Sequence, residues 1–206
     1  MISIIDYGMG NIRSIQNALE YLETEYRVTN ISDLILSSSK LILPGVGSFK
    51  VAMENLNKMD LIPTLNKAAL EMKIPILGIC LGMQLLGDYG EEEGGIQGLG
   101  WVSGRVQALS PDDSSLKVPH IGFNSTYFES QENNIFEGLP SQTDFYYVHG
   151  YSMICDDPGD VTSWTYYGNK IVASIQRENI CGVQFHPEKS QSNGLTVLNN
   201  FINLKL

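Results

Sequence analysis

Short apolar runs alternate with amphipathic stretches through the first half of the chain. The run at residues 2–5 is rich in β-branched residues, and the turn-rich YGMGN follows it. Apolar residues then recur at helical spacing, which predicts a helix from a cap at Asn11 to about Leu22. The same pattern predicts further strands at 26–28, 40–43 and 74–79, and helices at 51–73, interrupted near Pro63, and at 81–86. Strands that alternate with helices indicate a mostly parallel sheet covered on both faces.

The pattern changes from about Gly100. Shorter β-like segments follow, namely WVSGRVQAL, DFYYVHGYSM, KIVASIQ and ICGVQFH, and they indicate antiparallel additions to the sheet. A last helix runs through Leu195, Leu198 and Phe201. The segments SPDDSS and DDPGD are typical of exposed loops rather than of domain linkers. The sequence therefore predicts one α/β domain over residues 1–206, with a mixed, mostly parallel central sheet flanked by helices.

The net charge of the chain limits the classes of partner that it is expected to bind. Acidic residues outnumber basic ones 23 to 13, which gives a formal net charge of −10 and argues against nucleic acid or an anionic membrane as the main partner. An acidic surface can still meet a basic protein. We expect no signal peptide, because MISIIDYG lacks a basic start and reaches Asp6 early. No apolar stretch has the length that a bilayer needs.

The three cysteines are widely spaced, at positions 80, 155 and 181. An odd set with these spacings suggests neither a disulfide framework nor a zinc site. We therefore expect no metal and a reduced, cytoplasmic setting.

Cys80 lies in GICLG, directly after the expected strand 74–79. The segment fits the pattern Gly-x-nucleophile-x-Gly of a tight strand-turn-helix elbow, at the strand end where ligands of α/β sheets gather. The glycines allow close backbone approach, and a helix start stabilises a thiolate. The alternative is a small apolar residue packed in the core. The elbow pattern alone does not choose between them.

The segment GVQFHPEKSQ supplies a candidate base. Val183 and Phe185 alternate with polar neighbours as in a strand, and Pro187 ends the pairing. In extended chain, His186 and Glu188 point the same way, so the carboxylate can hold the imidazole in the tautomer that a general base needs. The alternative is a surface loop. Together with the elbow, the segment predicts a Cys-His-Glu triad.

Acyl transfer also needs groups that stabilise an oxyanion. The turn PGVG follows the strand at 40–43, and its residues Gly45, Val46 and Gly47 can direct backbone N–H groups toward the site. Its glycines also let a peptide rotate at low steric cost, so that this turn offers a switch. The amide of Leu81 is a second candidate donor, and a plain turn is the alternative for PGVG.

These segments together resemble a known family. PGVGSF, GICLGMQLL, GLGW, VPHIGFN, YYVHGY and GVQFHPEKSQSNGL are similar to the class I, triad-type glutamine amidotransferases, and among them to the glutaminase subunits of imidazole glycerol phosphate synthase. The resemblance covers nearly the whole chain and implies the flavodoxin-like architecture of that class. It implies glutamine as the substrate and no cofactor.

The resemblance also implies roles for single residues. Cys80 would attack the side-chain amide of glutamine, His186 would act as base and then acid, and Glu188 would orient it. Gln84 would hold the substrate, and Glu92 would bind its amino group, although Glu91 and Glu93 beside it leave the counterpart ambiguous. His149 and Tyr151 lie in the matching substrate segment.

A partner is implied as well. In the family, a cyclase subunit with a (β/α)₈ barrel receives the ammonia through a tunnel, in a heterodimer that makes imidazole glycerol phosphate for histidine. Phe123, Asn124 and Tyr146 would lie toward that partner. Two positions depart from the family pattern, since Phe123 stands where tryptophan is usual and Gly150 where serine or threonine is usual.

Three alternatives stay open at this point. A paralogue could feed ammonia to another synthase-like partner, for example in the amidation of a surface sugar, and Phe123 favours it slightly. A cysteine peptidase or stress protein could use a similar elbow, although the Glu two residues after His counts against it. An inactive regulatory partner is disfavoured because all three triad positions are filled.

Overall fold

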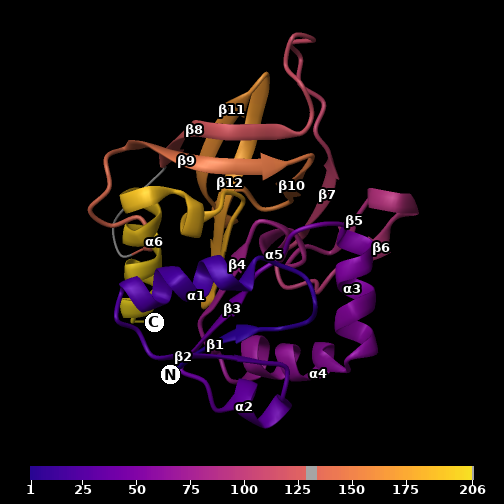
Figure 1. Ribbon diagram of the computed structural model, residues 1–206. Coiled ribbons are helices and arrows are strands. Elements are labelled where there is room, and N and C mark those ends of the chain that lie inside the picture. The colour runs from indigo at the N-terminus through magenta and orange to yellow at the C-terminus, as the bar shows by residue number, and fades with distance from the viewer. Residues whose placement is uncertain (129–133, 206) are drawn as a thin grey trace.

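The computed structural model describes residues 1–128 and 134–205. Within this part of the chain, the larger sheet has nine strands in the order β2-β1-β3-β4-β13-β12-β11-β8-β9 (Figure 1). The first five strands of this order are parallel to one another, and each later strand is antiparallel to its neighbour. The parallel strands are β1 (Ile2–Ile5), β2 (Tyr26–Thr29), β3 (Lys40–Leu43), β4 (Ile76–Ile79) and β13 (Ile180–Val183), and the antiparallel ones are β12 (Asn169–Arg177), β11 (Val161–Tyr167), β8 (His120–Phe128) and β9 (Gln142–His149). The expected mixed α/β sheet is confirmed.

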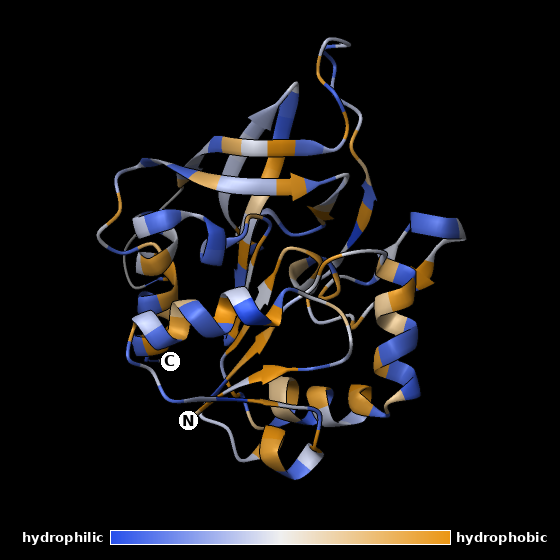
Figure 2. Cartoon of the chain, in the orientation of Figure 1, coloured by the Kyte–Doolittle hydropathy of each residue, from blue (hydrophilic) through white to orange (hydrophobic). Residues whose placement is uncertain are grey.

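Helices cover both faces of the parallel half. On one face lie α1 (Ile12–Tyr21) and α6 (Gln191–Asn203), and on the other lie α2 (Ser32–Leu36), α3 (Phe49–Lys58) and α4 (Leu61–Asn66) (Figure 1). Successive strand residues point to opposite faces, so each buried strand supplies both cores. Leu41 and Leu43 pack with α3 and α4, whereas Ile42 between them packs with α1 and α6. This is why these strands are continuous apolar runs (Figure 2).

A second sheet lies beside the first. Within the described residues it has four strands, in the order β10 (Tyr151–Cys155), β7 (Gly104–Ala108), β5 (Tyr89–Gly90) and β6 (Ile96–Gln97). The prediction that WVSGRVQAL and DFYYVHGYSM both add to the central sheet is therefore wrong. The second of these segments divides at Gly150, because β9 pairs with β8 while β10 pairs with β7.

Several predicted boundaries are confirmed and others are corrected. The Asn11 side chain caps α1 by accepting from the Ser14 amide at 3.3 Å, and β3 has the expected bounds. The expected helix at 51–73 breaks at Asp60, which has φ +53°, rather than at Pro63. Pro63 lies in the first turn of α4, where its missing N–H matters little. The pattern missed α2, β8 and β11.

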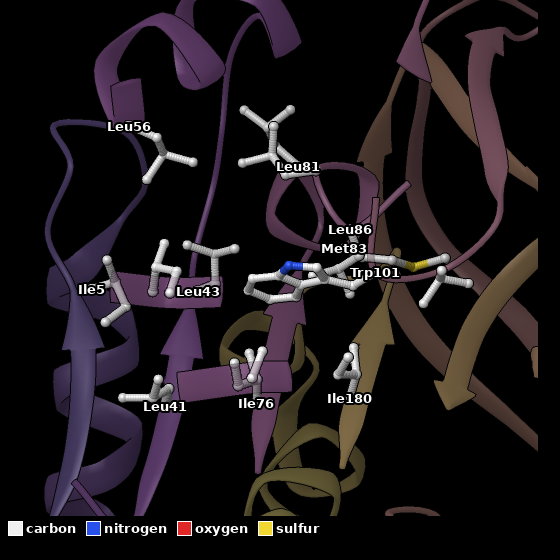
Figure 3. Close-up of a cluster of buried hydrophobic side chains, with 14 of the residues drawn as sticks. Ile5, Leu41, Leu43, Leu56, Ile76, Leu81, Met83, Leu86, Trp101 and Ile180 are labelled. Atoms are coloured by element: carbon white, nitrogen blue, oxygen red, sulfur yellow. The ribbon is translucent and has the colours of Figure 1, made fainter. Parts of the chain in front are cut away.

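The helix after β4 is short but firmly packed. This helix, α5 (Leu81–Gln84), is two residues shorter than the predicted helix at 81–86. Leu81, Met83 and Leu86 lie in the core formed with β1, β3 and β13, against the indole of Trp101 (Figure 3). The Trp101 indole N–H donates to Asn66 Oδ1 at 2.7 Å. Apolar packing therefore fixes the start of this helix relative to the sheet.

The described residues contain neither a candidate membrane-spanning helix nor a candidate metal cluster. No helix there is long and apolar enough to cross a bilayer. No group of three or more His, Cys, Asp or Glu side chains there is placed to hold a metal ion.

The closest backbone approach in this region gives a test. A Cβ added to Gly82 would overlap the carbonyl oxygen of Leu43. We therefore expect Gly82→Ala to lower the free energy of unfolding by about 3 kcal/mol or more in urea titrations. Gly150→Ala is the control, because its Cβ would meet only Val118 Cγ1 at 3.7 Å and Pro119 Cβ at 3.9 Å. Equal stability of the two variants would contradict the packing described for α5.

Candidate active site

Cys80 occupies the turn between β4 and α5. Its backbone has φ +54° and ψ −109°, a conformation that L-residues rarely adopt. The glycines on either side make the turn possible, since a Cβ on Gly78 would lie 2.7 Å from the carbonyl oxygen of Gly82. The Cys80 amide donates to the Val183 carbonyl at 2.8 Å, which ties the turn to β13. The predicted strand-turn-helix elbow is confirmed as a geometry.

His186 follows β13, the strand next to β4 in the sheet. Its amide donates to the Tyr146 carbonyl at 2.9 Å, and its carbonyl accepts from the Ser190 hydroxyl at 2.7 Å. The same hydroxyl accepts from the Tyr146 amide at 2.9 Å. Ser190 therefore fastens the backbone of His186 to β9, a role that the sequence analysis did not assign to it.

Glu188 holds the imidazole through a turn. His186 Nδ1 lies 2.7 Å from Glu188 Oε1, and both side chains are 2% exposed. The contact was predicted from an extended chain, and that geometry is wrong. Pro187–Lys189 form a 3₁₀ turn, and the turn brings the carboxylate back to Nδ1. Nε2 of His186 is buried and has no hydrogen-bond partner among the described residues.

The charge of His186 is set by its neighbours. Burial lowers the pKa of an imidazole, but here the adjacent Cys80 and Glu188 outweigh burial and raise the pKa of His186 to about 10. The ring that faces the sulfur is therefore readily protonated at neutral pH. An imidazolium of this kind is the form that hands a proton to a leaving amine.

A pocket of about 650 Å³ opens beside Cys80. Its walls come from the PGVG turn, the elbow, the 3₁₀ turn that starts at Glu92, the link between β9 and β10, and Lys189. The lining residues are Val46, Gly47, Ser48, Cys80, Leu81, Gln84, Glu92, Pro119, Val148, His149, Gly150, Tyr151 and Lys189. A second cavity, of about 350 Å³ between β10 and β12, contains none of the predicted site residues.

The predicted oxyanion residues divide into two groups. Val46, Gly47 and Leu81 line the pocket. Gly45 does not, because it packs against Leu81 and the Tyr7 hydroxyl, each 2.8 Å from where its Cβ would be. The buried Tyr7 hydroxyl also donates to the Pro44 carbonyl at 2.6 Å, which fixes the first part of the turn. Only the second part, at Val46 and Gly47, borders the pocket.

All four predicted substrate residues line the pocket. Of the three consecutive glutamates, only Glu92 does so, and its Oε2 also accepts from the Phe49 amide at 2.6 Å, at the start of α3. Gln84 uses both hydrogens of its amide inside the protein, toward the Tyr151 carbonyl at 3.0 Å and Gln184 Oε1 at 2.9 Å. Its Oε1 is therefore the atom left for a ligand.

The three residues predicted to face a partner behave differently. Phe123 is 52% exposed, and its ring packs edge-on against Tyr146 at 5.6 Å. Asn124 is half-buried. Its Nδ2 donates to the Tyr166 carbonyl at 2.9 Å and lies 3.2 Å from His120 Nε2. The place of Phe123, Asn124 and Tyr146 toward a partner stays a prediction.

Comparison with known proteins places this geometry in a family. The family described as glutamine amidotransferase class-I matches residues 3–204. The chain belongs to the class-I glutamine amidotransferase family. Within this family it is 42% identical over 207 residues to the imidazole glycerol phosphate synthase subunit HisH of Pelagibacter ubique, covering 98% of this chain and 99% of that protein. It is 46% identical over 200 residues to subunit HisH of Moorella thermoacetica, covering 97% and 93%.

A solved structure confirms the fold of this amidotransferase. A crystal structure titled as that of a glutamine amidotransferase superposes with a TM-score of 0.74, at 14% sequence identity, and covers 98% of this chain and 97% of that one. At this identity the likeness concerns the architecture alone. The resemblance stated from the motifs is thus confirmed at the level of the family and the fold.

Two histidine rings of this amidotransferase, His149 at the pocket wall and His120 next to it, are joined by a hydrogen bond. His149 Nδ1 lies 2.8 Å from the Tyr151 carbonyl, which only accepts, so Nδ1 carries the hydrogen. His149 Nε2 then accepts from His120 Nδ1 at 3.0 Å, and His120 Nε2 accepts from Asn124. Burial lowers the pKa of both His120 and His149 to about 4, so both are neutral at pH 7.

His120 and Gln184 are functional residues that the sequence patterns did not indicate. His120 stacks between Tyr147 and Tyr167, at ring separations of 4.9 and 4.1 Å. VPHIGFN and GVQFH both contain a polar residue between apolar ones, which is the ordinary pattern of a strand with one solvated face. His120 lies on the covered face of β8, opposite the exposed Ile121 and Phe123, and Gln184 is fully buried, so both polar residues must find internal partners.

The neutral, hydrogen-bonded pair His120 and His149 predicts that the stability of the fold depends on pH. Between pH 6.5 and 5 an unfolded chain takes up protons at His120 while the folded chain does not, so folding weakens as pH falls. His186, with a raised pKa, is protonated in both states below about pH 6.5 and adds little there. We expect His120→Phe to be destabilising at pH 7 and its penalty to shrink by roughly 1 kcal/mol at pH 5 in urea unfolding. The same penalty at both pH values would contradict a neutral His120.

Proposed function

We propose that residues 1–206 act as one amidotransferase domain that hydrolyses glutamine to glutamate and ammonia with the triad Cys80, His186 and Glu188. One observation carries this proposal. A cysteine on a strained elbow borders a pocket, and a buried histidine beside it is held by a carboxylate at 2.7 Å. This is the arrangement of nucleophile, base and orienting group that acyl transfer uses.

The chemistry follows from the positions of these groups. The Cys80 sulfur attacks the carboxamide carbon of glutamine, and the carbonyl oxygen becomes an oxyanion. The Leu81 amide would stabilise it, since the first amides of a helix have no internal acceptor, and so would backbone N–H groups of the turn at Val46 and Gly47. The protonated His186 gives its proton to the nitrogen, and ammonia leaves. Water, losing a proton to His186, then attacks the thioester, which releases glutamate and restores the sulfur.

The substrate residues fit an amino acid with a carboxamide end. Gln84 presents a carbonyl oxygen, which accepts from the N–H₂ of a carboxamide. Glu92 supplies a carboxylate for a ligand amino group, and Lys189 on the opposite turn supplies a cation. His149 and Tyr151 complete the wall. No step of this chemistry requires a cofactor.

A partner would receive the ammonia. Both curated relatives described above are named as subunits of imidazole glycerol phosphate synthase. We infer a heterodimer with a cyclase subunit of (β/α)₈-barrel fold, in the cytoplasm, that makes imidazole glycerol phosphate for histidine. Val118, Ile121 and Phe123 support this inference, because they expose 48%, 60% and 52% of their area near the pocket-lining Pro119 and Val148. The names of the relatives favour this partner over one in surface-sugar amidation.

The nucleophile gives the decisive test. Cys80→Ala should lower glutamine hydrolysis by the complex at least about a thousandfold, because the residues of a triad act as a unit. Synthesis from added ammonia should persist, since the acceptor site belongs to the partner. Cys155→Ala is the control, because Cys155 lies in β10 and outside the pocket. Glutaminase activity retained in Cys80→Ala would contradict the triad.

Substitution of the orienting carboxylate Glu188 should lower the turnover rate only in part. Glu188→Gln keeps a hydrogen-bond partner for His186 Nδ1 but removes a negative charge that raises the pKa of His186. We expect kcat to fall by about a hundredfold, less than in His186→Ala, because Glu188 makes no bond to the substrate. Steady-state kinetics of both variants in the complex decide this. A fully active Glu188→Gln would remove Glu188 from the mechanism.

A further inference from the structure

A buried glutamine contacts the attacking sulfur. Gln184 lies between β13 and Phe185 and is fully buried. Its Nε2 is 3.6 Å from Cys80 Sγ, and the triad leaves this contact unexplained. A buried amide is retained in a core only when its groups are paired, so each of its partners is informative.

The Tyr151 carbonyl fixes which way this amide points. A carbonyl oxygen only accepts, so the Gln84 atom 3.0 Å from it must be the nitrogen. The same nitrogen lies 2.9 Å from the Gln184 side chain, and that atom must therefore be an oxygen. The remaining end of Gln184, which faces Cys80, is then the N–H₂ group. The orientation follows from the obligatory acceptor at one end of the chain Tyr151–Gln84–Gln184–Cys80.

The second contact of the Cys80 sulfur is with a hydrogen-bond acceptor rather than a donor. Cys80 Sγ lies 3.8 Å from the Val148 carbonyl, which can accept from a thiol but offers nothing to an anion. Gln184 therefore supplies a donor to this sulfur from within the core, in addition to the His186 ring that faces it. A donor gains strength when its acceptor becomes charged, so this bond favours the thiolate over the thiol.

We propose that Gln184 donates a hydrogen bond that stabilises the Cys80 thiolate and positions it for attack, while Gln84 holds Gln184 in place. The proposal rests on the proposed function, because it assigns a helper to the same nucleophile. It adds a residue outside the triad. The donor directly follows β13, the strand that also leads to His186, so one strand end positions both partners of the sulfur.

The test measures the sulfur itself rather than turnover. In the purified full-length chain, alkylation of Cys80 by iodoacetamide is followed from pH 5 to 10 by mass spectrometry of the Cys80 peptide. Gln184→Met has a similar length but no donor. We expect the pH of half-maximal alkylation to rise by about one unit, so that the rate below it falls about tenfold. Gln184→Glu keeps an acceptor for Gln84 and should raise this pH further, since its carboxylate faces the sulfur.

Two comparisons separate this role from a structural one. Gln176→Met, at a half-buried position of β12, is the matched control and should leave the profile unchanged. If both Gln184 variants keep the half-maximal pH within about 0.3 unit of the wild type, the proposal is overturned, even if stability or turnover falls. Failure of the proposed function is seen separately, as glutaminase activity retained in Cys80→Ala. If Gln184→Met does not fold, Gln184→Leu, which also lacks a donor and adds no charge, takes its place.

Discussion

The contact between the start of α5 and the end of β3 constrains the whole site. Gly82 lies so close to the Leu43 carbonyl that no side chain fits there, and a Cβ on Gly78 would lie 2.7 Å from the Gly82 carbonyl oxygen. The chain can make this approach only if Cys80 takes a positive φ, which is unfavourable for a residue with a Cβ. Apolar packing of Leu81 and Met83 in the core holds the strained turn in place. The sulfur is thus presented to the pocket by a backbone that cannot relax without breaking the core.

A single carbonyl oxygen connects the second sheet to this turn. The Tyr151 carbonyl, at the start of β10, accepts from Gln84 Nε2 at 3.0 Å and from His149 Nδ1 at 2.8 Å. The first bond orients the two glutamines that end at Cys80, and the second orients the two histidines that end at Asn124. Because hydrogen-bond directions propagate along such chains, one acceptor decides the orientation of four side chains. The four-stranded sheet therefore orients side chains of the site and also forms part of the pocket wall.

The histidines of the chain are placed in opposite electrostatic settings. Burial dominates at His120 and His149 and lowers the pKa of each to about 4. At His186 the neighbouring Cys80 and Glu188 reverse the effect of burial and raise its pKa to about 10. A neutral pair therefore lies beside a readily protonated ring. The pair can hold structure without competing for the proton that the reaction moves, because at neutral pH its hydrogens are already committed to internal acceptors.

The sequence by itself determined the parallel half of the fold and the elbow. The runs at 2–5, 40–43 and 74–79, the cap at Asn11 and the spacing of GICLG are local signals, because each depends on residues within a few positions. The contact of His186 with Glu188 was also predicted, but from an extended chain, whereas Pro187–Lys189 form a 3₁₀ turn. Proximity in the sequence was enough to predict the pair but not its geometry.

Only the tertiary structure decided the rest. Gly150 sends β9 and β10 to different sheets, although the hydrophobic pattern runs through it unbroken, since strand pairing is chosen by partners far along the chain. His120 and Gln184 occupy positions that the pattern assigns to a solvated face of a strand, but both are buried, where His120 bonds to His149 and Gln184 contacts Cys80. In each case a polar side chain alternates with apolar ones, and alternation states only that two faces differ. Whether the second face meets water or another layer is fixed by long-range packing, and it is that packing which turns these polar residues into parts of the site.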